Sequence, residues 1–149
     1  MTGDEILKLA SELFASKGAK SEALCRAIIG RCYYAAYHLS LALFAEMGLP
    51  RSSDHKIPSR WLIESGEPNA KSAGRFMEDL YSARRRADYE LEHPVAIRES
   101  RDLQFVKSQI ELATDIKRLL AVCALEPARS QVQAGIQAFR QRTESPRRG

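Results

Sequence analysis

Three arginines and a histidine lie close together between Arg84 and His93, in the run Arg-Arg-Arg-Ala-Asp-Tyr-Glu-Leu-Glu-His. Six residues separate Arg86 from His93. A guanidinium group stays charged and binds phosphate, and an imidazole exchanges protons near neutral pH. This pair is a minimal set for cutting RNA without a metal ion, and Arg84 and Arg85 would add phosphate-binding groups. In the alternative interpretation, the arginines form a solvated helix surface and His93 simply lies in a loop.

A second polar group runs along one helix face, because Arg31, Tyr34 and His38 are spaced three and four residues apart. A guanidinium on a buried helix needs a carboxylate, and Asp88 is the favoured partner of Arg31, with Tyr34 or Tyr89 bonded nearby. Arg84 lies four residues before Asp88 and is an alternative partner for it. In this interpretation the five residues support the arginine cluster and do not touch a substrate.

The remaining aromatic and histidine residues favour structural roles. Tyr33, Tyr34 and Tyr37 lie in an apolar run at helical spacing, which is typical of core packing rather than of base stacking. His55 follows Asp54 in a polar segment and would be a ligand or a cap, although a single loop histidine usually is neither.

Size and charge favour one domain with an anionic partner. The 149 residues carry a net charge of +4, which permits RNA or a nucleotide but is far from the density of a nucleic-acid coat. Part of the surplus is at the C-terminus (Arg140, Arg142, Arg147 and Arg148), where we expect a disordered tail.

Cysteine usage and hydropathy point to the cytoplasm. Cys25, Cys32 and Cys123 are odd in number and show no metal-ligand spacing, so we expect buried, reduced thiols, no metal and no cofactor. The N-terminus is acidic where a signal peptide is basic, and no apolar run is long enough to span a membrane.

Periodic apolar residues predict an all-α chain. Thr2 and Glu5 form a capping box for a first helix that Gly18 would stop. Ser21 would begin a long second helix ending near Met47. Its middle is apolar on nearly every side, so it should be the central helix.

Four further elements follow. We expect a short helix around Trp61, closed by Gly66 and Pro68, and a fourth helix from about Ala70 that ends near Glu92. Since Pro94 disfavours a helical conformation at the preceding residue, His93 should lie just past that end. Ser100 would cap a fifth helix reaching Cys123. Pro127 would begin a weaker sixth element with Val132, Ile136 and Phe139 on one side, so the expected division is a bundle over 1–126 and an appendage over 127–149.

Three segments together resemble the HEPN superfamily, in particular its small stand-alone prokaryotic members. They are Gly-Arg-Cys-Tyr-Tyr-Ala-Ala-Tyr-His at 30–38, the loop histidine at 55, and Leu-Tyr-x-x-Arg-x-x-Ala-Asp-Tyr at 80–89. The resemblance covers about residues 5 to 125. It implies an up-and-down bundle of four to five helices that forms a homodimer.

The resemblance also implies two kinds of function, of which the sequence favours the first and leaves the second as the alternative. Many members are metal-independent endoribonucleases with an Arg-x4-6-His motif, which Arg86 and His93 satisfy, and act as toxins beside a nucleotidyltransferase-type antitoxin or in phage defence. Other members are non-catalytic modules that bind a nucleotide or dock against a nucleotidyltransferase. In the first case His93 would move a proton at the ribose 2′-hydroxyl or the departing 5′-oxygen, and Arg86 would hold the phosphate.

Overall fold

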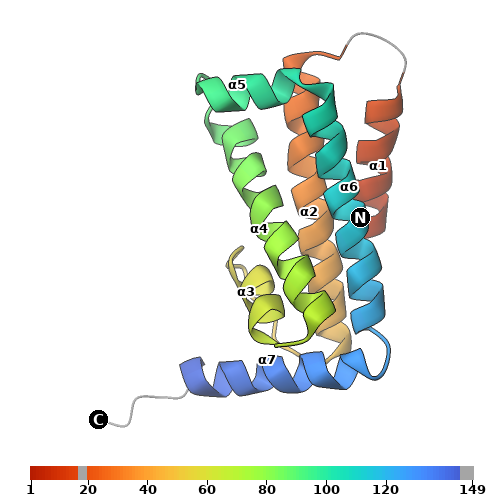
Figure 1. The fold of residues 1–149 in the computed structure, drawn as a ribbon, viewed down its shortest axis with the longest axis vertical. Helices are drawn as coiled ribbons and strands as arrows, with labels where there is room; N and C mark the ends of the chain where they lie inside the picture. The colour runs from red at the N-terminus through yellow and green to blue at the C-terminus, as the bar shows by residue number, and fades with distance from the viewer. Residues whose placement is uncertain (17–19, 145–149) are drawn as a thin grey trace.

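The computed structural model describes residues 1–16 and 20–144, and over these residues the chain is helical without a strand. Four long helices run alongside one another, α5 crosses one end of the bundle, α7 crosses the other, and α3 lies beside the lower part of α4 (Figure 1). The bounds are α1 Gly3–Ala15, α2 Glu22–Glu46, α3 Ile57–Glu64, α4 Pro68–Tyr89, α5 Pro94–Arg101, α6 Leu103–Cys123 and α7 Ala128–Glu144. The predicted all-α class is confirmed.

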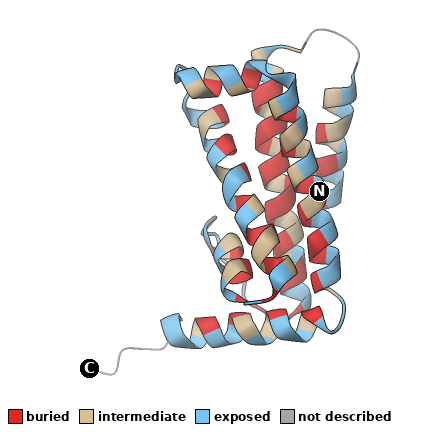
Figure 2. Ribbon diagram, in the orientation of Figure 1, coloured by how far each residue is buried: buried red, intermediate tan, exposed pale blue. Residues whose placement is uncertain are grey.

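Helix α2 is the central element, as its apolar pattern predicts. It contacts α1, α4, α5 and α6, and its buried residues cover most of the helix circumference, except the side that carries Arg31, Tyr34 and His38. Figure 2 shows this as a nearly continuous buried stripe through the middle of the bundle. Polar side chains on such a helix lose water on folding and must find partners inside the protein.

The first two helix starts follow the sequence signals. Thr2 and Glu5 make the reciprocal capping box, with the Thr2 backbone N–H donating to Glu5 Oε2 at 2.7 Å. Ser21 Oγ accepts the Leu24 N–H at 3.0 Å and begins α2. Helix α1 ends at Ala15, and the expected stop at Gly18 lies outside the described residues.

Helix α4 begins two residues earlier than predicted. Pro68 lies in the first turn of α4 and does not end α3. Proline is well tolerated there, because the backbone N–H groups of the first turn have no partner within the helix, so the missing N–H costs nothing. The buried Glu67 carboxylate caps the helix by accepting the Ala70 N–H at 2.7 Å and the Asn69 amide at 2.9 Å.

Helix α5 is absent from the sequence prediction. Helix α4 ends at Tyr89, before the predicted end near Glu92, and Pro94 begins a new helix with His93 as its N-cap. Ser100 lies inside α5 and donates to the Ala96 carbonyl at 2.8 Å, so it does not cap the long helix that follows. Asp102 has that role, since its Oδ1 accepts the Gln104 and Phe105 N–H groups.

Helix α7 packs against α3 and α6 through Val132, Ile136 and Phe139, the three residues predicted to share its apolar side. The prediction of a disordered tail is wrong for Arg140 and Arg142, which lie within α7. Arg140 pairs with Glu144 at 3.0 Å. Arg147 and Arg148 lie outside the described residues.

The three cysteines are free and buried, as expected. Burial raises the pKa of Cys32 and of Cys123 to about 12, which keeps both thiols protonated at neutral pH. Among the described residues, no helix is both long enough and apolar enough to cross a membrane.

Gly135 sets the approach of α7 to the end of α3. A Cβ added here would collide with the backbone carbonyl oxygen of Ser65. In an exposed helix, Gly→Ala adds roughly 1 kcal/mol of stability. We predict the opposite sign for Gly135→Ala, a lower melting temperature in circular dichroism, with Ala134→Ser as the exposed control on the same helix. A higher melting temperature would show that α7 does not dock in this way.

Glu67 makes stability depend on pH. Burial alone raises the pKa of its carboxyl, but the hydrogen bonds from Ala70 and Asn69 outweigh burial and hold the pKa below the ordinary 4.5. The stabilisation by the ionised carboxylate is therefore complete above pH 4.5 and is lost as the pH falls through the lower, folded-state pKa. Urea unfolding should show Glu67→Gln about 1–2 kcal/mol less stable at pH 7. The difference should shrink in acid, and a pH-independent difference would contradict this assignment.

Candidate functional site: the junction of α4 and α5

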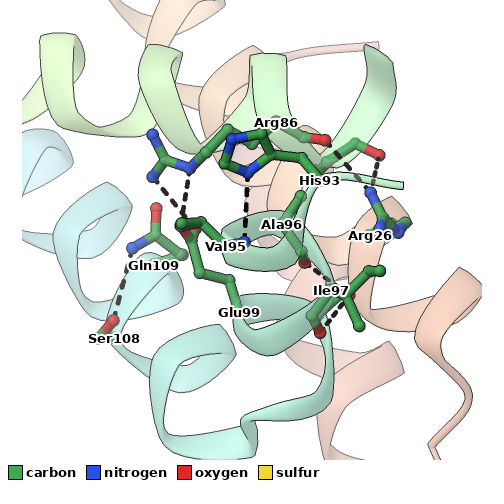
Figure 3. A network of polar contacts seen from close by, with 11 residues as sticks. Arg26, Arg86, His93, Val95, Ala96, Ile97, Glu99, Ser108 and Gln109 are labelled. Atoms are coloured by element: carbon green, nitrogen blue, oxygen red, sulfur yellow. Dashed lines mark hydrogen bonds and ion pairs between the residues drawn. The ribbon is translucent and has the colours of Figure 1, made fainter. Parts of the chain in front are cut away.

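Arg86 is held by a carboxylate from the next helix. Its Nε and Nη2 donate to Glu99 Oε1 and Oε2 at 2.7 and 3.1 Å, which is a two-pronged ion pair between α4 and α5 (Figure 3). The Arg86 side chain is 30% exposed and that of Glu99 only 11%. Hydrogen bonds between charged groups that pair in this two-pronged geometry are stronger than hydrogen bonds between neutral groups. The charge of Arg86 is thus already neutralised within the chain.

His93 is exposed and caps α5 with its own ring. Its Nδ1 accepts the Val95 backbone N–H at 3.2 Å (Figure 3). Because this hydrogen bond uses the lone pair of Nδ1, the proton of the neutral ring belongs on Nε2. His93 therefore offers an N–H donor at Nε2.

The structure brings Arg86 and His93 to the same short helix. His93 caps the start of α5, and Arg86 of α4 binds Glu99 near the end of α5. The ion pair therefore holds α5 against α4 after the chain turns at residues 90–93. Arg85 is exposed beside them. The run from 84 to 93 has no net charge, because its three arginines are balanced by Asp88, Glu90 and Glu92.

Arg84 is buried, in contrast to its predicted role in binding phosphate. Its Nε donates to Asp88 Oδ2 at 2.9 Å, and its Nη2 donates to the hydroxyls of Tyr34 and Tyr89 at 2.6 and 3.2 Å. The guanidinium also lies 5.0 Å from the Tyr34 ring centre. Burial alone lowers the pKa of Arg84, but Tyr34, Tyr89 and Asp88 together raise it above its ordinary value. Arg84 thus remains charged, and its hydrogen bond to Tyr34 joins α4 to α2.

The favoured pairing of Arg31 with Asp88 does not form. Asp88 binds Arg84 instead, which is four residues away on the same helix. Arg31 donates only to the Ala27 carbonyl, at 3.4 Å. A Cβ at position 30 would lie 3.2 Å from Asp88 Oδ1, so Gly30 keeps α2 close to this carboxylate.

Arg31, Tyr34 and His38 nevertheless share one groove with Asp88, as their spacing predicts. The groove has a volume of about 420 Å³ and is completed by Ile6 and other α1 residues. Burial is the main cause that lowers the pKa of His38, and Arg51 lowers it further. At neutral pH the groove therefore contains a neutral imidazole.

Tyr33 and Tyr37 of α2 pack in the interior, as expected, whereas Tyr34 is half-buried at the groove. Tyr33 and Tyr37 are buried, and both contact the His55 ring, with centroids 6.0 and 4.8 Å away. The Tyr33 hydroxyl lies 3.3 Å from His55 Nδ1. His55 thus fastens the loop before α3 to the central helix.

Arg26 is an important residue that the sequence interpretation missed. Its Nη1 donates to the Ala87 carbonyl at 3.0 Å and to the Arg86 carbonyl at 3.2 Å, and its Nη2 donates to the Leu91 carbonyl at 3.0 Å. The Ala87 carbonyl lies in the last turn of α4, where backbone carbonyls lack a partner within the helix, and the Leu91 carbonyl lies in the turn that follows α4. No sequence signal marks this role of Arg26, because the three backbone carbonyls that it binds lie 60 to 65 positions away in the sequence.

No protein-family model, curated protein or solved structure matches this chain. Within the described ranges, no group of three or more histidine, cysteine, aspartate or glutamate side chains could hold a metal ion.

Adjacent arginines should differ sharply in their effect on stability. Arg84→Met would leave Asp88 and two tyrosine hydroxyls without their donor and should cost about 2–3 kcal/mol in urea unfolding. Arg85→Ala, one residue away and exposed, should change the free energy of unfolding by less than about 0.5 kcal/mol. Equal effects would mean that the Arg84 network does not stabilise the fold.

Proposed function

We propose that this chain is a non-catalytic, HEPN-like helical module that pairs as a homodimer and binds a nucleotide or docks against a nucleotidyltransferase-type partner. The observation that supports this most directly is the two-pronged ion pair between Arg86 and Glu99. Glu99 balances the charge of this guanidinium and occupies its Nε and Nη2 edge, so a phosphate would have to compete with a carboxylate for Arg86.

The capping role of His93 also opposes proton transfer. A general base needs a free lone pair, but with Nδ1 accepting from Val95 the ring proton is on Nε2. A general acid needs both ring nitrogens protonated, which would break the cap at Nδ1. In the geometry of the free chain, His93 therefore presents a hydrogen-bond donor at Nε2.

The groove that contains Arg31 and Asp88 supports the homodimer. In a two-fold interface every contact occurs twice. Two residues of opposite charge on the same surface can therefore each pair with the other residue's copy in the partner protomer. Arg31 has no carboxylate partner among the described residues, and Asp88 is 33% exposed on its side chain. Tyr89 follows directly at 65% exposure and adds apolar surface next to this groove.

A metal-independent endoribonuclease is the second candidate, favoured by the exposed Nε2 of His93 at the same junction as Arg86. In that reaction the ribose 2′-oxygen would lose its proton to a base and attack the phosphorus, and the 5′-oxygen would leave with a proton. His93 would have to release Val95, and Arg86 would have to exchange Glu99 for the phosphate.

Incubation with RNA in EDTA separates the two functions. We expect no cleavage by the wild-type chain, and none by Glu99→Gln, which frees Arg86 while keeping a side chain of the same shape. His93→Ala and Arg86→Ala serve as matched controls for contaminating nuclease. RNA cleavage by wild type or Glu99→Gln that His93→Ala abolishes would overturn the proposal and establish the nuclease.

A further inference from the structure

A hollow of about 390 Å³ lies on the α3 side of the bundle, away from the α4–α5 junction. The loop before α3 contributes His55 and Lys56, the first turn of α3 contributes Ser59 and Arg60, and α4 contributes further side chains including Tyr81. The volume falls within the range of pockets that hold small molecules.

The floor of the hollow is aromatic and apolar. Tyr33 and Met77 are almost completely buried there, and the Tyr81 ring centre lies 5.4 Å from that of Tyr33. His55 is next to Tyr33 and is held by the Tyr33 hydroxyl. The Tyr81 ring is inclined by 57° to that of Tyr33 and is only half-buried, so a heteroaromatic base can stack against Tyr81.

The rim of the hollow is cationic. Lys56 and Arg60 are exposed, and neither forms an ion pair with a carboxylate in the part of the chain that the structure describes. The Arg60 guanidinium lies 5.6 Å from the Phe139 ring centre, and that of Arg142 lies 5.9 Å from the same ring. Helix α7 therefore supports Arg60 and brings a further positive charge nearby.

Hydroxyl and carboxylate groups complete the lining. Tyr81 and Ser82 reach the hollow from α4, and no described residue forms a hydrogen bond with either hydroxyl group. Glu78 is exposed at the same rim. A carboxylate there suits the hydroxyls of a sugar and repels a second phosphodiester, which disfavours a continuous strand of nucleic acid.

We propose that this hollow binds one nucleoside phosphate, with the base on the aromatic floor, the phosphate between Lys56 and Arg60, and the ribose hydroxyls at Glu78. The inference rests on the proposed nucleotide-binding function and assigns it a location. Because the arrangement combines an aromatic surface with two cations, it should prefer the complete nucleotide to the nucleoside or to free phosphate.

Isothermal titration calorimetry on the full chain tests the assignment with adenosine diphosphate, adenosine and inorganic phosphate as separate probes. We expect measurable binding of adenosine diphosphate and at least about tenfold weaker binding of the other two. Lys56→Ala with Arg60→Ala should weaken adenosine diphosphate binding by more than about tenfold, because both charges contact phosphate. Arg98→Ala with Lys107→Ala removes the same two residue types from exposed positions on α5 and α6 and should leave the affinity unchanged.

Three results would overturn the inference: no binding of adenosine diphosphate by the wild-type chain, equal affinity for inorganic phosphate, or undiminished affinity in the Lys56 and Arg60 variant. The last of these would refute only the location and leave nucleotide binding intact. Failure of the proposed non-catalytic function has a different signature, namely RNA cleavage that depends on His93.

Discussion

The burial of most of the circumference of α2 is the constraint on which the rest of the structure depends. A central helix can carry polar side chains only if neighbouring helices supply their partners. Arg26 solves this by reaching the C-terminal carbonyls of α4, and Tyr34 by accepting a hydrogen bond from Arg84. Both contacts fix the end of α4 against the middle and start of α2, and so determine where the chain turns into α5.

That turn determines what the arginine–histidine motif does. Since α5 begins at Pro94, His93 falls at the N-cap and Glu99 comes within reach of Arg86. The same spacing on a chain without α5 would leave both side chains open to a ligand. Here Arg86 and His93, the two residues that resemble a catalytic pair, instead make contacts that hold α5 in place after α4. This geometry is the reason that we propose the non-catalytic function.

The helical periodicity of the sequence was sufficient to predict the class of fold, the central position of α2 and the apolar side of α7. It was not sufficient for α5, because a proline can follow the end of one helix or occupy the first turn of the next, and the sequence alone does not show which of the two applies to Pro94. The shared groove of Arg31, Tyr34 and His38 follows from their spacing, whereas the choice of partner for Asp88 does not. The sequence favoured Arg31 over Arg84 as the partner of Asp88, and this was wrong, because the packing of α4 against α2 leaves Asp88 with Arg84. Arg26 was unpredictable for a further reason, since backbone carbonyls leave no trace in the identity of a residue.

The central claim is that the Arg86 guanidinium forms a stabilising ion pair with Glu99 instead of binding a substrate. A double-mutant cycle measures the strength of this ion pair directly. The free energies of unfolding of wild type, Arg86→Ala, Glu99→Ala and the double variant give the coupling between the two side chains. Our account predicts a favourable coupling of about 1–3 kcal/mol, as expected for a partly buried, two-pronged ion pair. A coupling near zero would contradict it, because Arg86 would then be available to bind phosphate.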